Sequence, residues 1–356
     1  MINKNFWKNK NVLITGHTGF KGSWLCLILS IFGANVYGYS LKPHTKSLFN
    51  YLKIEKKIKK SFYGNIKDKK KLSNFIKKND FSIIIHMAAQ PLVLESYNNI
   101  DETISTNVIG TINLLEVLNN YKKRYFFLNI TTDKVYEPHK KLFLNKEDGK
   151  LFGKDPYSAS KVLSDLLTQS YNYFDIHNKD KKYFVARSGN VIGGGDFSEN
   201  RIIPDIYKSF KYKKILKIRN PKSIRPWQHV LDPLTGYLKL IEKNYKNNSM
   251  KVDCSWNFGP NKSSYVDVQN LVNRSQQISS LKFKFRLSSS NNYKETKILG
   301  LDSSKSKKYL DWKPNLNINQ SIAYTFKWYE NFESKQINNY DFTVNQIYEY
   351  FNLIRV

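Results

Sequence analysis

The chain has 356 residues, of which 40% are hydrophobic and 15% aromatic, so it can bury a large core and is expected to form two lobes. No apolar run is long enough to span a bilayer, and the first residues lack the apolar centre of a signal peptide. The two cysteines, Cys26 and Cys254, have no motif spacing, and the six histidines do not pair at ligand spacings. We therefore expect a reduced, cytoplasmic setting and no metal site.

The formal net charge of +29 at pH 7 makes nucleic acid a candidate partner. The excess is mostly lysine and is spread over the whole chain, however. It forms neither a basic stripe interleaved with aromatic residues nor a recognition helix. We interpret the charge as diffuse and keep a basic nucleic-acid-binding protein only as a distant alternative.

The first motif is a glycine-rich turn between a predicted strand and a predicted helix. Val12 to Ile14 predict a buried parallel strand, and Ser23 to Phe32 predict the helix that packs on it. The T-G-H-T-G-F-K-G turn from Thr15 to Gly22 spaces its glycines as G-x-x-G-x-x-G, which differs from the usual dinucleotide fingerprint G-x-G-x-x-G. Glycines let a backbone approach a phosphate pair, and the helix start then faces the pyrophosphate. With a second strand at Asn35 to Tyr39, the turn favours nucleotide binding.

The next segments do not decide between NAD and NADP as the cofactor. The end of the second strand, Ser40 to Pro43, lacks the carboxylate that usually binds the adenosine ribose of NAD. Lys42 would suit a ribose phosphate, as in NADP. After a third strand, Asn65 and Ile66 either edge an adenine or form an ordinary strand-to-helix turn.

A fourth buried strand is expected from Phe81 to Gln90 and ends in small residues, which leave room for a ligand at the carboxyl edge of a parallel sheet. We interpret His86 as a packed histidine. The following helical pattern, from Asp101 to Asn119, carries Asn107 on its apolar face. This asparagine either contacts backbone or water or lies on the surface.

The fifth strand, Tyr125 to Ile130, is followed by two threonines, an acid and a base, Thr131 to Lys134. This group lies where the strand opens into a ligand crevice, although a turn with a helix cap has the same composition. A helix then begins near Asp155 and places Tyr157 and Lys161 on one face. A nearby ammonium group stabilises a phenolate and lowers the pKa of tyrosine, which suits a general base.

These motifs together resemble the extended short-chain dehydrogenase/reductase superfamily. The acid after Thr132 is typical of its nucleotide-sugar 4,6-dehydratases, and a lysine directly after that acid, Lys134, resembles the CDP-glucose 4,6-dehydratases. The likeness continues through the A-R-S-G-N-V-I-G-G-G-D block at 186–196, the block at 223–234 and L-D-W-K-P at 310–314. It therefore covers about the whole chain.

The resemblance implies an α/β fold: a Rossmann-type doubly wound parallel sheet with a smaller, interleaved C-terminal lobe. Residues 1–187 are expected to bind NAD and residues 188–356 mainly to bind the nucleotide sugar, with segments near 225–259 returning to the first lobe. A homodimer or homotetramer is implied as well.

The resemblance also implies NAD, tightly held and regenerated in each turnover. The cofactor contacts that it implies are Thr15, Gly16, Gly19, Phe20, Gly22, Asn65, Ile66, Ala88, Ala89, Gln90, Asn107, Tyr157 and Lys161. On the substrate side, the guanidinium fork of Arg225 suits a diphosphate. His229 either contacts substrate or ties the lobes together. The expected substrate contacts are Asn190, Arg201, Arg219, Arg225 and His229.

The implied reaction is that of a lyase: conversion of CDP-D-glucose to CDP-4-dehydro-6-deoxy-D-glucose, an early step toward dideoxy sugars of surface polysaccharide such as O-antigen. Tyr157, assisted by Lys161 and Thr132, would take the proton of the 4-hydroxyl. Asp133 is expected to act as acid on the departing 6-hydroxyl and Lys134 as base at C5, which requires a neutral lysine. Another nucleotide-sugar 4,6-dehydratase or a 4-epimerase is the alternative, and the Asp133–Lys134 couple argues against an epimerase.

Overall fold

A computed structural model describes residues 2–174, 180–245, 254–288 and 296–353 of the chain. Its centre is a seven-stranded parallel sheet in the order β11-β6-β5-β4-β1-β2-β3. After β1 the chain continues to β2 on one side, and after β4 it continues to β5 on the other side. A crevice therefore opens between the carboxyl ends of β1 and β4. The strands are β1 (Asn11–Thr15), β2 (Asn35–Ser40), β3 (Lys60–Tyr63), β4 (Ile83–His86), β5 (Tyr125–Ile130), β6 (Lys181–Ser188) and β11 (Ser255–Phe258).

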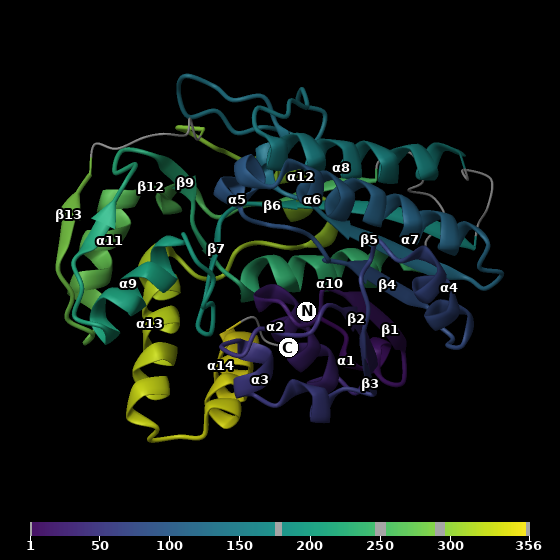
Figure 1. Ribbon diagram of the computed structural model, residues 1–356, viewed down its shortest axis with the longest axis horizontal. Helices are drawn as coiled ribbons and strands as arrows, with labels where there is room; N and C mark the ends of the chain where they lie inside the picture. The colour runs from purple at the N-terminus through teal and green to yellow at the C-terminus, as the bar shows by residue number, and fades with distance from the viewer. Residues whose placement is uncertain (1, 175–179, 246–253, 289–295, 354–356) are drawn as a thin grey trace.

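Helices cover both faces of the sheet (Figure 1). One face packs on α2 (Phe20–Ile31) and α10 (Leu231–Tyr245), and the other packs on α4 (Lys69–Lys77), α7 (Gly110–Asn119) and α8 (Pro156–Phe174). The inner strands are buried on both sides, which explains their unbroken apolar runs, such as the three isoleucines of β4. The predicted doubly wound parallel sheet is confirmed.

Shorter helices complete the first half of the chain. The helix expected over Asp101 to Asn119 is divided: α6 passes through a π-helical turn, Ser105–Ile109, into α7. The remaining short helices of this half are α1 (Lys4–Trp7), α3 (Leu48–Tyr51), α5 (Val93–Asn98) and α6 (Ile100–Ile104).

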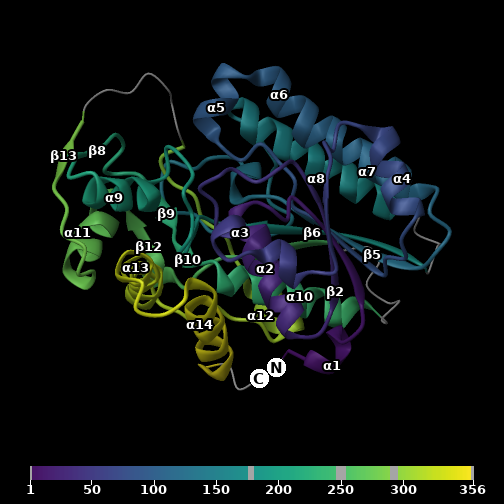
Figure 2. The same cartoon turned by 60° about the horizontal axis from the view of Figure 1, so that its bottom comes forward.

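The second half of the chain builds a smaller group of elements beside the carboxyl edge of the sheet, on the same side in both views (Figures 1 and 2). It contains three two-stranded sheets, β7 with β10, β8 with β13, and β9 with β12. Their bounds are β7 (Val191–Ile192), β8 (Leu216–Ile218), β9 (Ile224–Pro226), β10 (Gln228–His229), β12 (Tyr265–Asp267) and β13 (Phe285–Leu287). The helices of this half are α9 (Ile202–Lys211), α11 (Val268–Ile278), α13 (Ile318–Ser334) and α14 (Asn339–Leu353), and α12 (Ser304–Leu310), which packs on β11 and α10 of the first lobe instead.

The two halves are interleaved in space. β11 pairs with β6 in the main sheet, and α10 packs against it, so segments beyond residue 187 contribute to the first lobe. The division of the chain at residue 187 stays a prediction.

A buried ion pair joins the sheet to α8. Asp165 of α8 and Arg187 of β6 are almost fully buried and form two hydrogen bonds of 2.9 Å. The other guanidinium N–H groups donate to the Tyr136 hydroxyl, the Glu147 carbonyl and the Ser255 hydroxyl. All five donors of this arginine are thereby satisfied, which is the condition for burying its charge.

Replacing Asp165 by Asn should destabilise the fold by about 3–5 kcal/mol, because it leaves the Arg187 guanidinium buried without a countercharge. Urea unfolding followed by circular dichroism measures this loss. The matched control is Glu137→Gln, which breaks an exposed ion pair with Lys150 and should cost less than about 1 kcal/mol. Equal costs for the two variants would contradict the role of the buried pair.

Candidate active site

The glycine turn lies at the β1–β4 crevice, and its shape excludes side chains at two positions. Gly16 has a φ of +74°, and a Cβ there would lie 2.7 Å from the Ala88 backbone nitrogen. A Cβ on Gly22 would clash with the Gly16 carbonyl oxygen. The backbone of the turn therefore packs directly on the loop after β4, and α2 begins at Phe20 with open N–H groups at the crevice.

Thr15 and His86 fix the loop after β4 by hydrogen bonds. The Thr15 hydroxyl accepts from the Met87 and Ala88 backbone N–H groups at 3.1 and 3.2 Å and contacts His86 Nδ1 at 2.7 Å. His86 Nε2 contacts the Thr111 hydroxyl at 3.1 Å, and burial lowers the pKa of His86 to about 3. Both side chains are buried, so Thr15 positions the backbone that faces the crevice.

Asn107 connects the same loop to α8. Its Oδ1 accepts from the Gln90 N–H at 2.8 Å, while its Nδ2 donates to the Gln90 carbonyl at 3.0 Å and to the Ser160 hydroxyl at 2.8 Å. These contacts use the amide fully, and they lie in the π-helical turn, a feature that is frequent at functional sites. Asn107 therefore makes the backbone contact that the sequence left open.

The Thr132-Asp133-Lys134 group follows β5 and forms a single 3₁₀ turn, Asp133–Val135. The Thr132 hydroxyl donates to Asp133 Oδ1 at 2.9 Å, and the Lys134 ammonium lies 3.5 Å from the same oxygen. Asp133 is 1% exposed, and its Oδ2 has no hydrogen-bond partner within the described residues. A buried carboxylate oxygen without a partner is costly in a fold, which favours a role in the reaction.

Tyr157 and Lys161 approach this group from α8, whose first turn is capped by Asp155. Lys161 donates to the Ile130 carbonyl at 2.9 Å, and burial lowers its pKa to about 8. Burial raises the pKa of Tyr157 to about 12, while a hydrogen bond with Thr132 opposes the rise. The lowered tyrosine pKa that the sequence predicts is therefore not produced by these residues alone, because Lys161 is bound to the strand.

One cavity of about 2120 Å³ extends from the glycine turn across the carboxyl edge of the sheet into the smaller lobe. Among the predicted residues, those that line it are Gly16, Gly19, Phe20, Gly22, Asn65, Ile66, Ala88, Ala89, Thr132, Lys134, Tyr157, Lys161, Asn190, Arg201, Arg219 and Arg225. Thr15, Gln90, Asn107, Asp133 and His229 lie behind this lining.

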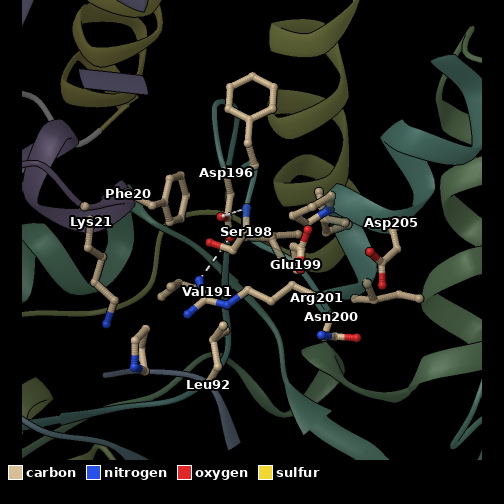
Figure 3. Close-up of a pocket in the computed structure, with 18 of the residues that line it drawn as sticks. Phe20, Lys21, Leu92, Val191, Asp196, Ser198, Glu199, Asn200, Arg201 and Asp205 are labelled. Atoms are coloured by element: carbon tan, nitrogen blue, oxygen red, sulfur yellow. Dashed lines mark hydrogen bonds and ion pairs between the residues drawn. The ribbon is translucent and has the colours of Figure 1, made fainter. Parts of the chain in front are cut away.

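The smaller lobe brings charged groups to the far side of the cavity (Figure 3). Arg201 pairs with Asp196 at 3.0 Å and extends toward the first lobe, and Arg219 contacts Asn200 at 3.4 Å. Arg225 is nearly buried and donates to the Ile224 and Lys297 carbonyls. Its backbone contacts fix the direction in which the guanidinium faces the cavity.

His229 is fully buried between aromatic rings of the two lobes, Trp24 of α2 and Tyr324 of α13. Burial lowers its pKa to about 3. Of the two sequence interpretations, this position matches the one in which His229 ties the lobes together.

Two lining residues were missed by sequence reasoning. Lys21 lies inside the glycine turn, and its Nζ donates to the hydroxyl of Ser188, at the end of β6, at 3.1 Å. The signal for Lys21 was its charge at a turn position that otherwise carries small or apolar residues. No local signal marked Ser188.

The sequence model of the GDP-mannose 4,6 dehydratase family matches residues 13–325. The chain belongs to this family. A CDP-glucose 4,6-dehydratase from Salmonella typhimurium is 40% identical over 336 residues, which cover 93% of each chain. The predicted resemblance to nucleotide-sugar dehydratases is confirmed.

Two solved structures share the fold at lower identity. The dTDP-glucose 4,6-dehydratase of Bacillus anthracis, in complex with NAD, has a TM-score of 0.74 at 22% identity and covers 91% of this chain and 98% of that one. A UDP-glucose 4-epimerase of Thermotoga maritima, with UDP-glucose, has a TM-score of 0.78 at 21% identity and covers 91% and 99%. Dehydratases and an epimerase are thus alike in fold, and only site residues can separate them.

The described ranges contain no helix with the length and apolarity needed to cross a membrane. Within the same ranges, no cluster of histidine, cysteine and acidic residues is suited to hold a metal ion.

Proposed function

We propose that this protein is a CDP-glucose 4,6-dehydratase, a hydro-lyase that converts CDP-D-glucose to CDP-4-dehydro-6-deoxy-D-glucose and water. The observation that carries the proposal is the Asp133–Lys134 couple beside Thr132 and Tyr157. A 4-epimerase needs the tyrosine and the threonine but no acid and base for loss of water. The 40% identical relative, named for CDP-glucose, supports the choice of substrate.

The crevice fits a dinucleotide, and we propose NAD, which the B. anthracis relative contains. Gly16 and Gly22 leave no room for a Cβ, and Ala88 and Ala89 keep the strand end open. The turn and the start of α2 would hold the diphosphate, and Asn65 and Ile66 would border the adenine. When bound, NAD would supply the acceptor for the C4 hydride and its donor to C6, and a positive charge that would favour the Tyr157 phenolate.

Tyr157 and Thr132 act on the 4-hydroxyl of the hexose. Tyr157 takes the proton of this hydroxyl as the C4 ketone forms, and the ketone in turn acidifies the proton on C5. Burial opposes a charged phenolate, whereas the hydrogen bond with Thr132 and the charge of Arg201 favour it. We assign the C5 proton to Lys134, whose amine must be neutral to take it and which returns it to C5 after water has left.

The protons balance through Thr132. The reaction removes one proton from O4 and must deliver one to the departing 6-hydroxyl. Tyr157 is hydrogen-bonded to Thr132, whose hydroxyl donates to Asp133 Oδ1. A shift along this chain restores the phenolate and places the proton on Oδ1 of Asp133. Because Oδ2 has no hydrogen-bond partner to hold it, the carboxyl group can rotate and turn this O–H toward the leaving 6-hydroxyl.

The substrate is tested by incubating the purified protein with NAD and with CDP-, dTDP-, GDP- or UDP-glucose. We expect a 4-keto-6-deoxy product from CDP-glucose, detected by mass spectrometry, without net formation of NADH. Asp133→Asn and Lys134→Met should lower this product about 10²–10⁴-fold, because each removes one proton-transfer group. A 4-epimer in place of the keto sugar, or full activity of both variants, would contradict the proposal.

The proton path is tested by a matched pair of variants. Thr132→Val removes the bridging hydroxyl and should slow formation of the 6-deoxy product about 10²–10⁴-fold, whereas Thr132→Ser, which keeps the hydroxyl, should stay within about tenfold. Equal rates for Thr132→Val and Thr132→Ser would exclude the path.

We propose that the protein forms a homodimer through the layer of α6, α7 and α8, or a homotetramer built from two such dimers. Large apolar side chains are exposed on this layer, which Figures 1 and 2 show along one face of the molecule. An unpartnered apolar layer of this kind is typical of a protein interface. The exposed residues are Ile100, Ile109, Leu163 and Leu166, exposed by 51%, 45%, 45% and 46%.

The double variant Leu163→Glu/Leu166→Glu should dissociate the dimer, because it places charge in the apolar contact. Light scattering after size exclusion measures the mass. Tyr348→Glu on α14, which is 45% exposed on a different helix, is the control and should leave the mass unchanged. A wild-type monomer at micromolar concentration would refute the proposed interface.

We also propose a cytoplasmic enzyme whose product supplies deoxy and dideoxy sugars for surface polysaccharide. Both cysteines are free and buried, which fits a reducing compartment.

A further inference from the structure

Lys21 is the cavity-lining residue to which the proposed reaction assigns no role. It lies in the first turn of α2, is partly buried, and extends from the glycine turn into the cavity (Figure 3). Its Nζ reaches the Ser188 hydroxyl at 3.1 Å, across the crevice. Within the described ranges it has no carboxylate at ion-pair distance.

The Ser188 hydroxyl already accepts two hydrogen bonds. The hydroxyl of the buried Tyr237 donates to Ser188 Oγ at 2.8 Å, and Lys21 donates to the same oxygen. A hydroxyl that accepts twice keeps only its own hydrogen to donate. Lys21 and Ser188 therefore present hydrogen-bond donors to the cavity.

The charges around Lys21 are predominantly positive. Those that act on it are Arg201 from the smaller lobe, Lys161 of α8, and Lys134 and Asp133 after β5. Three cations and one carboxylate act on Lys21, and Arg201 is also paired with Asp196. Together with the ammonium of Lys21, the cations still outnumber the carboxylates in this partly buried space. Such an arrangement favours an anionic ligand.

We propose that Lys21 is a diphosphate-binding residue, anchored on Ser188 and facing Arg201 across the cavity, that binds the diphosphate of a nucleotide in this site. The diphosphate belongs either to the dinucleotide at the start of α2 or to the nucleotide sugar. The inference rests on the proposed function only in taking nucleotides as ligands.

Diphosphate binding at Lys21 is coupled to uptake of a proton. Burial, together with the charges of Arg201 and Lys161 and against that of Asp133, lowers the pKa of Lys21 to about 7. Above pH 7 the amine is therefore mostly neutral without ligand. A bound diphosphate favours the ammonium form and raises this pKa, so binding takes up a proton. Affinity should be constant below about pH 7 and fall by up to about tenfold per unit above it.

Isothermal titration calorimetry at pH 8 tests this in two buffers of different protonation enthalpy. Nucleotide-free protein is titrated with NAD in one arm and with CDP in the other. Wild type should take up close to one proton more than Lys21→Met in at least one arm. Lys21→Arg, which is always charged, should take up no more protons on binding than Lys21→Met.

Comparison with Lys21→Met removes contributions from Lys161 and from the terminal phosphate of CDP, which titrate in all variants. Lys70→Met, on the exposed start of α4, controls for the loss of one positive charge from the protein. A change confined to NAD assigns Lys21 to the cofactor, and a change confined to CDP assigns it to the nucleotide sugar.

Equal proton uptake by wild type and Lys21→Met in both arms would overturn the proposal, as would equal affinities at pH 6.5. Thermal melting confirms that the variants are folded. Because the titrations involve no turnover, they can fail while CDP-glucose is still dehydrated, and they can succeed if another nucleotide sugar is the substrate.

Discussion

The geometry of the site depends on the hydrogen bonds that the buried carboxylate of Asp165 accepts. Tyr157, Lys161 and Asp165 follow one another at four-residue intervals on α8, so one face of the helix carries the general base, its lysine and this anchor. Asp165 accepts from Arg187 of β6 and from Thr131, directly before the Thr132-Asp133-Lys134 group. A single buried acid thereby sets the distance between the helix and the ends of β5 and β6.

The same arginine extends this order beyond the sheet. Its bonds to Tyr136, Glu147 and Ser255 connect the loop after β5 to β11, which comes from the second half of the chain. Reactive groups must be held within a few tenths of an ångström to work together. A fully satisfied buried ion pair is one means of holding them, at a cost in desolvation that hydrophobic packing would avoid.

The excess of positive charge in the site favours anionic ligands. Lys21, Lys134, Lys161 and Arg201 outnumber the carboxylates beside them, Asp133 and the Arg201 partner Asp196, and burial lowers the pKa of both Lys21 and Lys161. Bound diphosphates would offset this positive excess. The glycine turn and the arginines of the smaller lobe supply the approaches for two of them, one on each side of the reacting hexose.

Much of the fold and of the chemistry was predictable from the sequence because it depends on local patterns. Apolar runs predicted the strands, glycine spacing predicted the turn, and the four-residue spacing of Tyr157 and Lys161 placed both on one helical face. The tertiary structure decided what depends on contacts between distant residues. Asn107 hydrogen-bonds to Ser160 of α8, and His229 is packed between the lobes. Lys21 donates a hydrogen bond to Ser188, which lies 167 residues away in the sequence. Burial set the pKa of Tyr157, because desolvation depends on every element that surrounds a group and no spacing along the chain records it.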